Sequence, residues 1–195
     1  MNYLYIFVLA ISSMNLGSIS PILKVVNFAN EVVLNDVIAA ENTLGCTVKP
    51  AAFQVTIGEE YYPNAKAYDL QNPLTVDCID GDLEKVAEYF FTPDSIIRVV
   101  LTTWNMPVKL GMPTPEAKQE ALIRNKLIFQ DKLTELQNIL ITQLGQPYVA
   151  GKAVQLEGNS NRIDYKWKGS FHAELSVVFS DKLGYGRLRL LVFKD

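Results

Sequence analysis

Apolar residues recur every three or four positions between Thr114 and Pro147, a spacing typical of an amphipathic helix. Thr114 can cap the first amide groups, and Pro115 suits the first helical position because no amide donor is needed there. Gly145 can adopt the left-handed conformation just past the last turn. At about 100° per residue, one stripe collects the apolar side chains Leu122, Phe129, Leu133, Leu136, Leu140 and Leu144. We therefore predict a long helix that buries this stripe.

Alternating apolar and polar residues after this helix predict an antiparallel β-meander. The expected strands span 153–157, 162–168, 171–179 and 187–193. A two-residue loop at Gly169 and Ser170 would mix the faces of the strands it joins. A three-residue loop pairs Trp167 with Phe171 and keeps one apolar row together. We expect the helix stripe to pack on that row.

Strands are also expected earlier in the chain. A run rich in β-branched residues at 96–104 is apolar on both faces, which predicts a central strand. Shorter β-like pieces occur at 52–57 and 74–79, between turn-forming prolines and glycines.

Residues 82–91 fit two different structures. Asp80 and Gly81 can form a hairpin turn, which would make this stretch the second strand of a hairpin. Alternatively, Asp82 can cap a helix whose apolar side chains follow helical spacing. The periodicity favours the helix.

The predicted fold class is α+β, with a long amphipathic helix packed on an antiparallel β-meander and with further strands and a short helix before it. A second helical pattern begins near Pro21 and ends at Gly45. The chain then divides into a candidate export signal at 1–20, an N-terminal helical segment at 21–45 and a single α+β domain at 46–195.

The N-terminus predicts export. Residues 3–11 form an apolar run that is too short to span a membrane but has the length of a signal-peptide core. Small polar residues at 12–20 resemble a cleavage region, although no Lys or Arg precedes the run. We expect cleavage within residues 10–20 and a periplasmic or secreted location. The alternative is a retained apolar helix or buried strand in a cytoplasmic protein.

Cys46 and Cys78 are the only cysteines. In an exported protein we expect them to form a disulfide, because oxidising compartments favour it. Gly45 before Cys46 suggests a lipoprotein acylation site, but acidic residues interrupt the segment upstream. We therefore do not expect lipidation.

The composition is that of a globular protein, with 49% hydrophobic and 20% charged residues. The net charge of −3 gives no reason to expect a nucleic acid partner. The charge is uneven, since residues 1–92 contain 4 Lys/Arg and 11 Asp/Glu and residues 93–195 contain 14 and 10. These two parts would attract each other within one fold, or the acidic part would face a basic partner.

The pieces Leu144-Gly145-Gln146-Pro147, Trp167 and the strand from Phe171 to Phe179 resemble the small bacterial envelope domains of the BamE/SmpA outer-membrane lipoprotein type. The resemblance covers residues 116–193. It implies a helix followed by an antiparallel meander, and a non-enzymatic role in the cell envelope.

The cluster Glu59, Glu60, Tyr61 and Tyr62 is the candidate binding site, because exposed tyrosines beside charge make useful contacts with a partner. The alternative is a loop whose tyrosines pack on the core. We expect His172, the only histidine, on the polar face of its strand beside Lys166. Paired metal ligands, a phosphate-binding loop and a nucleophile motif are missing from the sequence, so we expect no catalytic residue, metal or cofactor.

The sequence predicts a non-catalytic exported domain that binds a protein partner, as an inhibitor, an immunity-like protein or an envelope assembly factor. One alternative is an enzyme of unrecognised type built on carboxylates and tyrosines. Another is a structural protein that self-associates through apolar residues of the long helix, namely Ile123, Leu127 and Ile141. We expect neither a nucleic acid partner nor a transmembrane segment.

Overall fold

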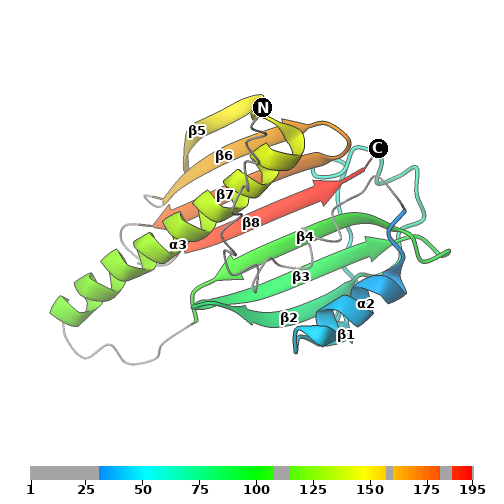
Figure 1. Cartoon of the computed structure of the whole chain (residues 1–195), viewed down its shortest axis with the longest axis horizontal. Helices are drawn as coiled ribbons and strands as arrows, with labels where there is room; N and C mark the ends of the chain where they lie inside the picture. Colours follow the sequence, from blue (N-terminus) through cyan, green and yellow to red (C-terminus); the bar gives the residue numbers. More distant parts are fainter. Residues whose placement is uncertain (1–30, 108–114, 157–159, 181–185, 195) are drawn as a thin grey trace, which may run out of the picture.

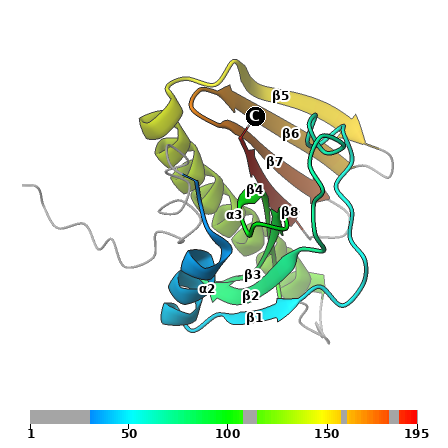
Figure 2. The same cartoon turned by 90° about the vertical axis from the view of Figure 1, so that its right-hand side faces the viewer.

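The computed structural model describes residues 31–107, 115–156, 160–180 and 186–194. These residues form one antiparallel sheet of eight strands, with α2 (Leu34–Thr43) and α3 (Pro115–Leu144) on the same face (Figures 1 and 2). The strands are β1 (Thr47–Pro50), β2 (Leu74–Asp80), β3 (Leu83–Phe91), β4 (Ile97–Asn105), β5 (Val149–Leu156), β6 (Ser160–Lys168), β7 (His172–Ser180) and β8 (Gly186–Phe193). Their order across the sheet is β1-β2-β3-β4-β8-β7-β6-β5.

The two halves of the described chain share one order of elements. Each half is a helix followed by a four-stranded antiparallel meander, α2 with β1–β4 and then α3 with β5–β8. The last strands of the two halves, β4 and β8, pair antiparallel at the centre of the sheet. The first strands, β1 and β5, therefore become its two edges.

This architecture corrects the predicted fold class. The protein is a large antiparallel sheet with two helices in its described part, and half of the strands precede the long helix. Residues 82–91 form strand β3, whereas the apolar spacing favoured a helix. β3 lies between β2 and β4, and besides the buried residues that face the helices it carries Val86 and Phe90 on the opposite face, so its apolar residues do not alternate strictly. The buried Lys85 also interrupts the alternation that would mark a strand.

Two shorter predictions need correction as well. Residues 52–57 are not a strand but part of the irregular segment 51–73, and the first strand lies just before it, at Thr47–Pro50. In the predicted helix at 21–45, residues 31–33 are not helical, and Val33 is extended and forms a β-bridge with Ile96. Residues 1–30, with the predicted export signal and the start of that helix, lie outside the described residues.

The long helix has the bounds that the sequence predicts, Pro115 to Leu144. Gly145 follows with a φ of 78°, and its amide donates a hydrogen bond to the carbonyl of Ile141, which ends the helix. Phe129, Leu136 and Leu140 of the predicted stripe are buried in the core between α3 and the sheet. The N-terminal end of α3 projects past the sheet (Figure 1).

The β6–β7 hairpin has the predicted faces in a different register. Trp167 pairs with Ala173 instead of Phe171, so the ladder is shifted by two residues. The loop still contains three residues, because Phe171 leaves the ladder and its carbonyl accepts a hydrogen bond from the amide of Gly169. A shift of two residues returns each side chain to the same face, so the apolar row is retained.

Cys46 and Cys78 form the expected disulfide, with their Cα atoms 4.8 Å apart. The bond joins residues 32 positions apart and ties the chain after α2 to β2. In the chain-entropy model a loop of this length contributes about 3–4 kcal/mol. The disulfide is compatible with a location outside the cytoplasm. Neither helix of the described residues combines the length and the apolar character that crossing a membrane requires.

Candidate binding groove

The sheet face turned away from α2 and α3, which we call the open face, is covered at one end by segment 51–73 (Figure 2). Tyr62 of this segment is fully buried, and its ring contacts that of Phe193 at a centroid distance of 5.4 Å. Phe90 and Val99 complete a second small core under the segment. This apolar contact fixes the segment on the sheet and leaves the rest of the open face to form a groove.

The groove lies between this segment and strands β5–β8, and its volume is about 360 Å³. Glu60 and Tyr61 line it from the segment. The charged residues that line it from the strands are Arg162, Asp164, Lys166, Glu174, Arg187 and Arg189. Side chains from separate parts of the chain therefore converge on one hollow.

Strand alternation explains why charges gather there. On β8, Leu188 and Leu190 are buried in the core beneath the helices, so Arg187 and Arg189 project to the open face. On β7, Ser176 pairs with Arg189 in the ladder and shares this face. The same alternation on β6 directs its charged residues into the groove.

Two of the four cations in the groove are already paired. Nη2 of Arg162 lies 2.9 Å from Oδ2 of Asp164, and Nζ of Lys166 lies 2.7 Å from Oε1 of Glu174.

The two arginines of β8 differ from these cations. Neither Arg187 nor Arg189 forms an ion pair with a described residue, and the Nε atom of Arg189 is buried without a hydrogen-bond partner. Glu88 of β3 interacts with Arg189 at longer range: burial raises the pKa of Glu88, and the arginine charge opposes that rise. The groove thus contains two guanidinium groups that form no ion pair with a described residue.

The structure divides the candidate cluster Glu59–Tyr62. Glu60 and Tyr61 line the groove, and Tyr61 is 45% exposed. Tyr62 belongs to the second core, and Glu59 pairs with Lys66 at 2.9 Å outside the groove. A binding role for the cluster stays a prediction, and the geometry favours its middle two residues.

Sequence reasoning missed the two arginines of β8 as site residues. Their strand was predicted, and the alternation placed them on its polar face, so a signal was present. The sequence did not show that β6, β7 and β8 would bring this face next to Glu60 and Tyr61.

His172 lies on the open face, but its neighbours differ from those expected. The shifted register pairs it with Lys168 instead of Lys166. Its ring stacks on that of Phe193, with centroids 4.7 Å apart and the planes 7° from parallel. The contact makes His172 part of the packing around the second core.

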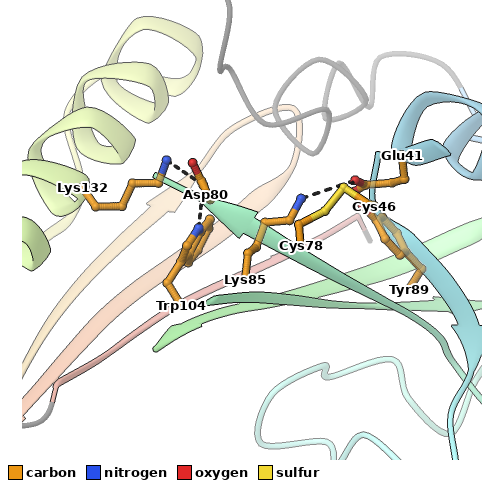
Figure 3. Close-up of polar contacts among 8 residues, drawn as sticks. All are labelled: Glu41, Cys46, Cys78, Asp80, Lys85, Tyr89, Trp104 and Lys132. Atoms are coloured by element: carbon orange, nitrogen blue, oxygen red, sulfur yellow. Dashed lines mark hydrogen bonds and ion pairs between the residues drawn. A yellow bond between two sulfur atoms is a disulfide. The ribbon is translucent and has the colours of Figure 1, made fainter. Parts of the chain in front are cut away.

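A buried polar cluster lies on the helix side of the sheet, beside the disulfide (Figure 3). Glu41 is fully buried, Nζ of Lys85 lies 3.3 Å from its Oε2, and the hydroxyl of Tyr89 donates a hydrogen bond to its Oε1. Burial, together with the Glu41 charge, raises the pKa of Tyr89, so this phenol keeps its proton.

Glu41 and the two cysteines lie close enough to suggest a metal site, with the ligand atoms all within 4.8 Å of one another. Both sulfurs are bonded to each other, however, which leaves one carboxylate already held by Lys85 and Tyr89. The cluster therefore holds α2 on the sheet, and its disulfide leaves no thiolate to ligate a metal.

A second polar cluster joins the two halves of the chain (Figure 3). Nζ of Lys132, on α3, lies 2.8 Å from Oδ2 of Asp80, at the end of β2. The same oxygen accepts a hydrogen bond of 2.8 Å from Nε1 of Trp104 on β4. Lys132 is 7% exposed, so this ion pair is shielded from water.

Comparison of the chain with protein-family models, curated proteins and solved structures found no match. The resemblance to the BamE/SmpA envelope domains stays an expectation.

Proposed function

We propose that this chain is a non-catalytic, exported domain that binds a protein partner through the charged groove of the open face. The observation that carries the proposal is a hollow of about 360 Å³, lined by Glu60 and Tyr61 on one side and by the charged strands on the other. Arginine and tyrosine are enriched at protein-binding surfaces, and the groove contains two arginines that form no ion pair with a described residue and one exposed tyrosine. Such a domain would act as an inhibitor, an immunity-like protein or an envelope assembly factor.

Crosslinking from defined positions tests this proposal. A photoreactive residue replaces Ser176, which lines the groove, or Gln130, which is exposed on α3. We expect the groove position to capture one partner from the native host and the helix position to capture none. Capture from Gln130 alone, or equal capture from both positions, would contradict the proposal.

Once the partner is known, charge reversal measures the contribution of the groove. Arg187→Glu should weaken binding about tenfold or more, because it removes a charge-assisted contact and adds repulsion. Arg124→Glu, the same change on the exposed surface of α3, should leave binding within about twofold. Equal losses would place the contact elsewhere.

Export is the second part of the proposal, supported by the apolar run at 3–11 and by the disulfide. The intact mass of the protein from its native host should correspond to a chain that begins within residues 10–20. A mature chain that begins at Met1 would contradict export.

Exposed apolar residues on α3 favour self-association as a second candidate function. Ile123 and Leu127 are 54% and 55% exposed, whereas Ile141 packs against the main core and would not contribute. Light scattering should then report a dimer that Leu127→Lys dissociates. A monomer at all concentrations would exclude this function.

A further inference from the structure

We infer that the partner presents an extended acidic segment to the groove, with two carboxylates two residues apart that bind Arg187 and Arg189. This inference rests on the proposed function and names the chemistry of the partner.

The chemistry follows from the state of the two arginines. Both line the groove without an ion pair to a described residue, and Nε of Arg189 is a buried donor without a partner. A guanidinium group without an ion pair gains free energy from a charged acceptor that reaches the accessible part of its side chain. A carboxylate matches the fork of the guanidinium group with two parallel hydrogen bonds.

The spacing follows from the strand. Arg187 and Arg189 are second neighbours on β8 and project to one face, about 6.6–6.8 Å apart along the strand. Second neighbours in an extended partner segment have the same spacing and direction. Carboxylates at positions i and i+2 can therefore face both arginines, whereas those at i and i+1 point to opposite sides.

The acidic residues of the groove decide between a protein segment and a nucleic acid. Glu60, Asp164 and Glu174 lie in the same hollow as the arginines. Every nucleotide of a nucleic acid strand carries a phosphate charge, so some phosphates would face these carboxylates. A peptide can separate its acids with neutral residues, which matches the alternating charges of the groove.

Fluorescence anisotropy on the full chain tests the inference with labelled peptides of about ten residues in a Ser/Gly background. One carries Glu-Ser-Glu at its centre, the second carries Glu-Glu-Ser, and the third carries Gln-Ser-Gln. We expect the first to bind about tenfold more tightly than the third and about fivefold more tightly than the second. Added salt should weaken binding of the first peptide most.

The arginines are tested with the double variant Arg187→Gln/Arg189→Gln, which should bind all three peptides equally. Arg124→Gln is the matched control and should preserve the preference. If thermal melts show that the double variant is unfolded, Ser176→Glu replaces it. This change adds a negative charge beside Arg189 and should weaken binding of the Glu-Ser-Glu peptide about tenfold.

Three outcomes would overturn the inference: equal binding of the two acidic peptides, no preference over the amide peptide, or tighter binding of oligothymidylate of similar length. None of them would by itself overturn the proposed function, which the crosslinks from Ser176 and Gln130 test separately. Capture of a partner whose binding survives replacement of its acids by amides would keep the proposed function and reject the acidic segment.

Discussion

Glu41 carries a charge that has no contact with solvent, and its environment compensates for this. Lys85 supplies the opposite charge and Tyr89 a hydroxyl donor, both from β3. A buried pair of this kind adds little stability relative to two apolar side chains, but the loss of one partner leaves an uncompensated charge.

Removing one member of the pair should therefore lower the free energy of unfolding more than removing both members. We expect Lys85→Met and Glu41→Leu each to lower the free energy of unfolding by about 3–5 kcal/mol. The double variant should lose less than either single variant, and therefore clearly less than the sum of the two. Urea unfolding of the four proteins in a double-mutant cycle measures this difference, and strictly additive losses would contradict it.

Glu88 predicts a pH dependence of stability. Burial raises its pKa in the folded state, so its contribution is favourable below the unfolded pKa, near 4.5, and is lost as the pH rises through the folded pKa. The glutamine side chain of the Glu88→Gln variant stays neutral, so this variant should be more stable than the wild type at pH 7. Thermal melts should show this difference vanishing below about pH 4.5. A variant less stable than the wild type at pH 7 would contradict the argument.

For a single residue, the sequence pattern indicates which face of its strand the side chain occupies but not which residues the side chain contacts. Alternation placed Arg187 and Arg189 on the polar face of β8, and the structure agrees. It gave no reason to separate Tyr61, which is exposed, from Tyr62, which is buried. That difference depends on Phe193, a residue far along the chain whose ring packs on Tyr62.

Helix α3 allows a test of its predicted phase. Leu136 is fully buried, so Leu136→Ala should lower the free energy of unfolding by about 2–5 kcal/mol. Asp131→Ala, at an exposed position, should change it by less than about 0.5 kcal/mol. Denaturant unfolding measures both values, and similar losses would mean that both sides of the helix are buried.

Glu135, the residue next to Leu136 in the sequence, would be a poor control for that experiment. It lies 3.0 Å from Lys132, which also pairs with Asp80. Its removal would disturb the cluster that joins the two halves. Asp131 has no contact of this kind among the described residues and isolates the effect of burial.

Elements could be predicted where the local pattern was complete. Capping and breaking residues marked both ends of α3, and alternation marked β6, β7 and β8. Strand β1 has only four residues and ends at Pro50, so it is too short to show a period. The pairing of β4 with β8 joins segments far apart in the chain, so local periodicity cannot predict it.

The whole molecule should unfold as one unit, because its halves share a sheet. The β4–β8 ladder and the Asp80–Lys132 ion pair both cross from one half to the other. Trp104 lies in the first half and Trp167 in the second, so single-tryptophan variants report each half by fluorescence. In each single-tryptophan variant, we expect the midpoint measured by fluorescence to coincide with the midpoint of global unfolding measured by circular dichroism.

Separate fluorescence transitions for the two halves would contradict this expectation. Lys132→Met serves as the further test, since it removes the ion pair and retains the length of the side chain. It should lower both midpoints together, although Lys132 belongs to the second half and Asp80 to the first.

The central position of β4 has a consequence during synthesis. β4 is complete at Asn105, but its partner β8 begins only at Gly186, about 80 residues later. At typical ribosomal rates of roughly 5–20 residues per second, the nascent chain waits about 4–16 s with this apolar strand edge unpaired. Open edges of this kind recruit other chains. Until β8 is made, one edge of β4 is therefore open to pairing with other chains.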